Sequence, residues 1–119
     1  MIFIGNDIVE ISRIKKTIDN YKDSFLNKIF SEEEISYCIN KASPEIHFAG
    51  KFAAKESVFK AIMQYDSSIN VYLKDITIIN DKDLKPYVKI SDKIPLTSNI
   101  QISISHTNSY ATSVALLYL

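Results

Sequence analysis

The sequence predicts an α+β fold in one domain spanning residues 1–119, and three features predict it. Helical patterns fill most of the first half of the chain, alternating strands fill the second half, and one strand precedes the helices. Helices and antiparallel strands that are segregated along a chain are typical of this class. The hydrophobic content is 46%. A chain of this length can bury one core but is too short for two ordinary domains.

The N-terminal third is predicted to contain a strand followed by two helices. Residues Ile2–Val9 are rich in β-branched side chains, which favour a strand. The segment Glu10–Leu26 has a helical pattern, with its basic side chains mostly on solvent-facing positions. Ser31 and Glu34 have the spacing of a capping box, in which each side chain bonds to the other residue's backbone amide. We expect a short helix from there through Cys38.

A long helix is predicted in the middle of the chain. Ser43 is suited to cap its free amides, and Pro44 is suited to the first helical position. The pattern continues to Gln64, and a polar loop follows at Tyr65–Asn70. At about 100° per residue, four large apolar side chains form one stripe along this helix. They are Phe48, Phe52, Phe59 and Met63.

The second half is predicted to form a hairpin and two further strands. Segments 74–79 and 87–90 flank the polar turn 80–83, as in a hairpin. Isoleucines alternate with polar residues from Ile100 to His106, which is typical of a half-buried strand. A turn then leads into the last strand.

That last strand, Tyr110–Leu119, contains the longest apolar stretch of the chain, Val114–Leu119. The stretch is far shorter than the roughly 20 residues that span a bilayer, so we expect a buried strand.

The charge and cysteine content restrict the classes of partner and compartment. Fourteen basic residues balance 14 acidic ones, so no overall field draws the protein to nucleic acid or to an anionic membrane. Cys38 is the single cysteine and cannot form an internal disulfide. The first residues carry Asp7 where a secretory signal would carry a basic residue. We therefore expect a cytoplasmic protein without nucleic-acid or membrane partners.

Two charged residues, Lys55 and Glu56, fall within the apolar arc of the long helix. An unpaired carboxylate on a packing face costs several kcal/mol, so Glu56 needs a cation. Asp7 and Glu56 would offer two hard oxygen ligands, which suit Mg²⁺ because it keeps waters and takes other ligands from substrate phosphates. Lys60 lies one turn after Glu56 and could neutralise a phosphate oxygen held by that metal.

Each of these residues also has a plainer interpretation. Asp7 could simply end a strand, and Glu56 with Lys60 could be an ordinary ion pair on a helix surface. His106 could be a turn or core histidine with satisfied nitrogens. The basic residues of the first helix could form a solvated face. Only their convergence in space would make these residues a site.

Three motifs in this chain resemble those of the bacterial holo-acyl-carrier-protein synthases, the short class of 4′-phosphopantetheinyl transferases. Residues Gly5–Ile14 resemble the GxDxxxxxRI opening of that family. Residues Lys51–Ala61 resemble its (R/K)FAAKEAxxKA helix, and Ser103–Ala111 resemble its closing SxSHxxxYA hairpin. The motifs occur in the family's order and extend from the start to the end of the chain.

The resemblance implies a fold, a reaction and an assembly. The implied fold is a long central helix packed on an antiparallel sheet. The implied reaction transfers the 4′-phosphopantetheine arm of coenzyme A (CoA) to a serine of apo acyl carrier protein and releases adenosine 3′,5′-bisphosphate. The implied assembly is a homotrimer with its sites at subunit interfaces.

The resemblance also implies roles for individual residues. By position, the Mg²⁺ ligands would be Asp7 and Glu56. The residues that contact CoA would be Lys51, Lys60, Ser105, His106 and Thr107. The residues that dock the acidic carrier helix would be Arg13 and its basic neighbours, including Lys16.

Some alternatives stay open at the level of sequence. The catalytic residues would be Asp7, Glu56 and Lys60, but the proton acceptor could be Glu56 itself or Asp7 acting through a metal-bound water. Lys51 stands where many relatives have arginine, and Tyr65–Ser68 stands where many have a glycine-containing loop. A Mg²⁺-dependent phosphodiester hydrolase and a non-catalytic module that binds CoA or an acidic partner are the competing functions.

Overall fold

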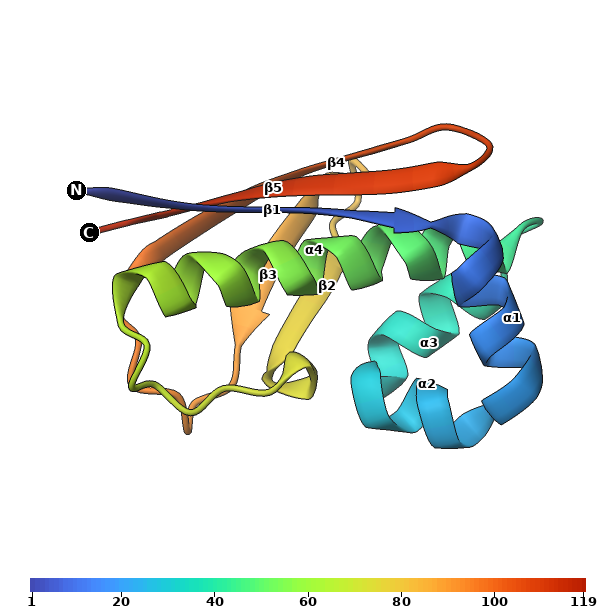
Figure 1. The fold of residues 1–119 in the computed structure, drawn as a ribbon, viewed down its shortest axis with the longest axis horizontal. Helices are drawn as coiled ribbons and strands as arrows, with labels where there is room; N and C mark the ends of the chain where they lie inside the picture. The colour runs from blue at the N-terminus through green and yellow to red at the C-terminus, as the bar shows by residue number, and fades with distance from the viewer.

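One long helix organises the molecule, which is described for residues 1–119 by a computed structural model. Helix α4 (Pro44–Tyr65) has 22 residues and lies against the sheet of β1, β5 and β4 (Figure 1). The hairpin β2–β3 packs on another side of α4, and the three short helices gather at its N-terminal end. The other elements are β1 (Ile2–Glu10), α1 (Ile11–Tyr21), α2 (Asp23–Ile29), α3 (Glu32–Ile39), η1 (Leu73–Asp75), β2 (Ile76–Asn80), β3 (Pro86–Ile90), β4 (Asn99–His106) and β5 (Tyr110–Tyr118). This arrangement confirms the predicted α+β class.

The main sheet is antiparallel, with β5 in the middle between β1 and β4. Gly5 pairs with Ala115 and Asp7 pairs with Ser113 across β1 and β5. Because side chains alternate between the faces of a strand, the odd-numbered residues of β1 and β5 face α4. Asp7 therefore points toward the helix rather than toward the outer face of the sheet.

A close contact between β1 and α4 sets the distance between the two elements. A Cβ atom placed on Gly5 would lie 1.9 Å from the backbone oxygen of Ser57, so only glycine fits there. Beside this contact, the hydroxyl oxygens of Ser57 and Ser113 lie 3.0 Å apart in the core. The close approach brings Asp7 within reach of the next turn of α4.

The apolar core has two parts that share α4. One part centres on small and branched side chains of α4, including Ala54, Val58 and Ile62, packed against β2 and β5. The other part includes Phe30 and Phe48 and fills the space among α1, α2 and α3. The predicted stripe on α4 is therefore partly wrong. Phe48 is buried, but the other three members, Phe52, Phe59 and Met63, are only half-buried.

The prediction of one helix over Glu10–Leu26 is wrong, because the chain forms two helices there. Lys22 adopts a left-handed conformation with φ of 47° and ends α1, while its amide donates to the oxygen of Ile18 at 2.7 Å. A new helix, α2, begins at Asp23. The break lets α2 turn Leu26 into the second part of the core.

The start signals of the other helices are confirmed, with one exception. Ser31 and Glu34 form the predicted capping box at α3. Pro44 occupies the first turn of α4, but Ser43 precedes it without a side-chain hydrogen bond, so the predicted serine cap is wrong. No helix combines the length and the apolar character that crossing a membrane requires.

The predicted strands are confirmed, but the burial of the last one is not. Hairpin β2–β3 and the antiparallel pair β4–β5 form as expected. In the stretch Val114–Leu119, however, alternate side chains such as Val114 and Leu116 are exposed on the outer face of the sheet. The stretch is therefore half-buried because only one face of the sheet is covered by α4.

Candidate active site

Asp7 and Lys60 meet where β1 crosses the C-terminal half of α4. The ammonium nitrogen of Lys60 lies 3.1 Å from Asp7 Oδ1 and donates to the backbone oxygen of Asn6 at 3.0 Å. Lys60 thus forms an ion pair with Asp7 and not with Glu56, its neighbour one turn earlier. An ammonium has three protons, so one donor of Lys60 remains for a further acceptor.

The other oxygen of Asp7 has no hydrogen-bond partner. Asp7 Oδ2 is buried and unpaired, which is rare in folded proteins and points to a missing ligand. Glu56 lies close enough that the Asp7 charge raises the pKa of its carboxyl, second only to the effect of burial, while Lys60 opposes the rise. A partly buried carboxyl whose pKa is raised by a second carboxylate is stabilised in its charged form by an added cation.

The donors in this place match one kind of metal. No group of three or more histidine, cysteine, aspartate or glutamate side chains could hold a metal ion. Asp7 and Glu56 therefore offer carboxylate oxygens only, too few for a calcium or zinc cage. Mg²⁺ accepts one or two protein carboxylates and completes its shell with water and substrate phosphates. The unpaired Oδ2 atom and the raised pKa of Glu56 both fit such an ion.

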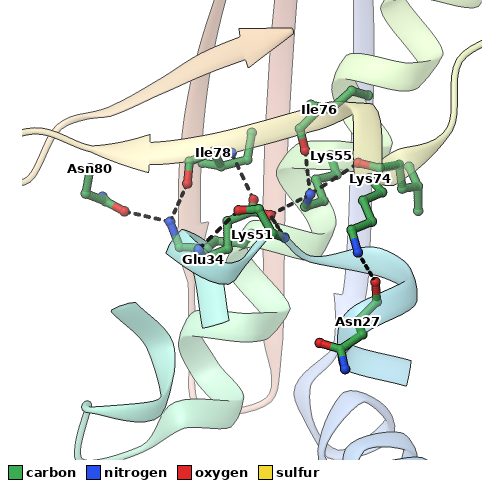
Figure 2. A network of polar contacts seen from close by, with 10 residues as sticks. Asn27, Glu34, Lys51, Lys55, Lys74, Ile76, Ile78 and Asn80 are labelled. Atoms are coloured by element: carbon green, nitrogen blue, oxygen red, sulfur yellow. Dashed lines mark hydrogen bonds and ion pairs between the residues drawn. The ribbon is translucent and has the colours of Figure 1, made fainter. Parts of the chain in front are cut away.

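Lys51 lies away from this pair. Its side chain is buried, and its ammonium donates to the oxygen of Ile78 at 2.7 Å and to Asn80 Oδ1 at 2.8 Å (Figure 2). Lys51 and Lys60 are about 180° apart around the axis of α4, since each residue turns the helix by about 100°. The structure does not bring Lys51 together with Asp7, Glu56 and Lys60 within one chain.

Lys51 instead shares a cavity of about 220 Å³ with His106. No acidic side chain lines this cavity, and His47 also faces it. Burial, followed by the charge of Lys41, lowers the pKa of His47. The remaining lining residues include Tyr37, Asn80, Leu84 and Pro86. A basic cavity with a tyrosine and two histidines can hold an anionic group and a planar ring.

The other two residues of the β4–β5 corner lie differently from His106. Ser105 is exposed and, by the alternation of the strand, faces the outer side of the sheet. Thr107 lies in the turn, where its Oγ1 accepts from the amides of Ser109 and Tyr110 at 3.1 Å each. Within one chain, the three residues therefore do not line a single pocket.

Arg13 and Lys16, which are predicted to dock the carrier protein, lie beside an apolar cavity. Arg13 lines a cavity of about 390 Å³, and the exposed Lys16 lies nearly one turn further along α1. The apolar lining consists of Ile8, Val9, Ile14, Phe25, Phe52 and Tyr110. Sequence reasoning missed this cavity because it assigned Phe52 to the core stripe. The only available signal was the large apolar residues near a basic helix.

The partner of Lys55 is Glu34 on α3. Their charged atoms are 2.7 Å apart, and both side chains are fully buried. Burial lowers the pKa of Lys55, and the charge of Glu34 opposes that effect. The capping box alone accounts for a glutamate at position 34, so nothing in the sequence indicated that Glu34 also pairs with Lys55. A larger cavity of about 590 Å³ lies at the C-terminal end of α4 and contains none of the predicted site residues.

Comparison with known proteins identifies the class to which this fold and site belong. The sequence model of the 4′-phosphopantetheinyl transferase superfamily matches residues 3–115. A holo-[acyl-carrier-protein] synthase of Protochlamydia amoebophila is 45% identical over 115 residues, which cover 94% of this chain and 93% of that protein. The chain belongs to the 4′-phosphopantetheinyl transferase superfamily and, within it, to the holo-acyl-carrier-protein synthases, which are enzymes.

Solved structures agree with this assignment. The holo-(acyl-carrier-protein) synthase of Bacillus anthracis, in complex with CoA (3′,5′-ADP), superposes with a TM-score of 0.81 at 31% identity. That match covers 98% of this chain and 95% of the other. The Helicobacter pylori synthase in complex with CoA gives a TM-score of 0.83 at 31% identity, with coverage of 96% and 98%.

Proposed function

We propose that this enzyme transfers the 4′-phosphopantetheine group of CoA to a serine of apo acyl carrier protein. The products are holo acyl carrier protein and adenosine 3′,5′-bisphosphate. The observation that carries the proposal is the unpaired, buried oxygen of Asp7 beside Glu56 and Lys60. A site with two neighbouring carboxylates and a lysine suits a substrate that brings both a metal and a diphosphate.

Asp7 and Glu56 would hold Mg²⁺ in this proposal. When bound, the ion neutralises charge on the diphosphate that is attacked and on the phosphate that leaves. Lys60 supplies a further positive charge to the same phosphates through its free donor. Lys60 would keep its contacts with Asp7 and with the oxygen of Asn6 while its third donor reaches a phosphate oxygen.

The serine hydroxyl must lose its proton as it attacks phosphorus. Glu56 is one candidate acceptor, because burial and the charge of Asp7 raise its pKa above the ordinary value and so make it a stronger base. Asp7, acting through a water, is the other. A carboxylate that ligates a metal is less basic, so the residue with the freer oxygen is the better base.

The basic cavity beside Lys51 would hold the nucleotide end of CoA. Lys51 and His106 face it, and Tyr37 offers an aromatic wall. A phosphate in the cavity would take over the Asn80 contact of Lys51. Ser105 and Thr107 lie on either side of His106, so in this proposal they contact the pantetheine and nucleotide from the rim.

The acyl carrier protein would dock on α1. Arg13 and Lys16 are exposed and carry no ion pair with this chain, so an acidic helix can approach them. The cavity beside Arg13 can take an apolar side chain from the same helix. A charged rim around an apolar centre is the usual composition of a protein interface.

Two observations support subunit association with composite sites, and we propose that the assembly is a homotrimer. Lys51 and Lys60 lie on opposite sides of α4, so a CoA molecule that contacts both needs α4 helices from two subunits. The outer face of the main sheet also exposes apolar side chains, with Ile4 at 53% and Ile8 at 65% exposure. An exposed apolar face of this kind marks an interaction surface.

The buried single cysteine also agrees with the cytoplasmic location that we propose.

The decisive experiment is mass spectrometry of an apo carrier protein incubated with CoA, Mg²⁺ and this protein. Transfer predicts that the carrier gains the mass of the phosphopantetheine arm and that adenosine 3′,5′-bisphosphate appears. Cleavage of CoA with an unchanged carrier would instead indicate a phosphodiester hydrolase. Binding of CoA with no change in either molecule would indicate a non-catalytic module.

A further inference from the structure

A buried polar network joins α4 to α3 and to β2. Besides its pairing with Glu34, Lys55 donates to the backbone oxygens of Leu73 and Ile76. Figure 2 shows these contacts converging on Lys55 in the space between α4, α3 and β2. All three protons of the ammonium therefore have partners inside the protein.

Glu34 is bonded as completely as Lys55. Its Oε1 atom accepts from the amide of Ser31 at 2.9 Å, and its Oε2 atom accepts from the amide of Ile78 at 2.9 Å. The oxygen of Ile78 in turn accepts from Lys51. The carboxylate of Glu34 thus connects the start of α3, the middle of β2 and Lys55, and Lys51 bonds to the same residue of β2 one turn earlier on α4.

We propose that Lys55 and Glu34 are positioning residues that fix the rotation of α4 about its axis and so hold Glu56 and Lys60 opposite Asp7. The inference rests on the proposed function, because the residues held in place are those of the proposed metal and phosphate site. Glu56 directly follows Lys55 in the same helix. Any rotation of α4 that moves Lys55 therefore moves Glu56 by the same angle.

A small rotation is enough to matter. A side chain on a helix ends about 6 Å from the axis, so a rotation of about 10° displaces it by about 1 Å. A displacement of about 1 Å in a catalytic group can lower a rate by about 100-fold. A device that limits rotation to a few degrees is therefore useful at this site.

Stability alone does not explain the network. A buried ion pair is often no more stabilising than apolar side chains of the same volume. The side of α4 that packs on the main sheet is lined by small apolar residues such as Ala54, Val58 and Ala61. These contacts are non-directional, whereas the ion pair and its hydrogen bonds have fixed geometry. Hydrogen bonds of Ser57, Lys60 and Gln64 join α4 to the sheet, and on its other side the buried directional contacts are those of Lys51 and Lys55.

The test compares the wild-type enzyme with the double variant Glu34→Gln/Lys55→Met and with Lys74→Met. The double variant removes both buried charges and nearly keeps the side-chain volumes. Lys74 is an exposed lysine of the same region that bonds to Asn27 rather than to Glu34, so it is the matched control (Figure 2). The measurements are the thermal midpoint, kcat and KM, and Mn²⁺ affinity by electron paramagnetic resonance with CoA but no carrier.

We expect the double variant to fold, to lose about 100-fold in kcat with little change in KM for the carrier, and to bind Mn²⁺ about tenfold more weakly. Lys74→Met should match the wild type in all three measurements. A folded double variant with wild-type kcat and wild-type Mn²⁺ affinity would overturn the inference.

If the double variant does not fold, Glu34→Asp decides, because it keeps the charge and shortens the side chain by one methylene. A folded Glu34→Asp variant should lose about tenfold in kcat, since the pair can then form only after α4 shifts. An unchanged kcat would contradict the inference. A wild-type protein without transferase activity would refute the proposed function instead, and Mn²⁺ affinity alone would then decide the role of the pair.

Discussion

Asp7 and Glu56 are the residues on which the proposed chemistry depends, and they come from elements far apart in the sequence. Replacing either should abolish Mg²⁺-dependent transfer while the fold survives. We expect Asp7→Ala and Glu56→Gln each to lower kcat/KM by at least about 100-fold, because two ligands are few and neither can be replaced from nearby. Intact-mass assays of the carrier measure this. Near-normal modification by either folded variant would show that the metal assignment is wrong.

The raised pKa of Glu56 also predicts how stability depends on pH without metal. A carboxyl whose pKa is higher in the folded protein contributes stability below its unfolded pKa and loses that contribution as pH rises through the folded pKa. Glu56→Gln removes this loss. In a chelating buffer, the variant should gain stability over the wild type between about pH 4 and about pH 7. Urea unfolding at both pH values measures it, and a difference that does not change with pH would contradict the raised pKa of Glu56.

The buried ion pair of Glu34 and Lys55 shows what a sequence pattern cannot predict. The position of Lys55 in an apolar arc indicated that it needs a partner, but the partner lies on another helix and already had a local role as a cap. The unpaired oxygen of Asp7 was also invisible, because burial of a single atom depends on how β1 lies on α4. Side-chain type and spacing predicted which charged residues lie on the buried face of the helix. They did not predict which atoms those residues contact.

Among the elements, the contact between β1 and α4 is the one on which the site geometry most depends. Gly5→Ala should destabilise the protein by about 3 kcal/mol or more, because its Cβ meets backbone atoms that cannot move aside. Gly50→Ala is the matched control. Its Cβ would meet only the γ2 methyl of Ile104, at 3.3 Å, which the side chain can relieve by moving a few tenths of an ångström, and alanine favours a helix interior. Denaturant unfolding of both variants measures the contrast, and equal effects would mean that β1 does not approach α4 so closely.

The sequence predicted most elements because their signals are local. The capping box of α3, the proline at the start of α4 and the alternation in β4 are all visible within a few residues. The break at Lys22 carries no glycine or proline, and tertiary packing of Leu26 decides it. Which face of α4 is most buried was also decided by packing. The close approach of β1 favours small side chains there over the phenylalanines.

The proposed trimer would bring together two groups of residues that lie apart within one chain. One group is Asp7 with Glu56 and Lys60, and the other is the cavity beside Lys51. The exposed apolar residues of the outer sheet face are the candidate interface, and Ile4 lies near their centre. We expect Ile4→Glu to dissociate the assembly and to abolish transfer, because it puts a charge at a buried contact. Sedimentation velocity with an activity assay measures both. Lys89→Glu, an exposed change on β3, is the control and should keep the assembly.

In the proposed site, Asp7 from β1 and Glu56 from α4 hold one divalent ion together with the diphosphate of CoA. A crystal structure with CoA and Mn²⁺, in which the anomalous signal locates the metal, shows whether they do. We expect one anomalous peak within bonding distance of a carboxylate oxygen of each residue and of the CoA diphosphate. Bound CoA with no metal between the two carboxylates, or with their oxygens directed to separate places, would contradict it.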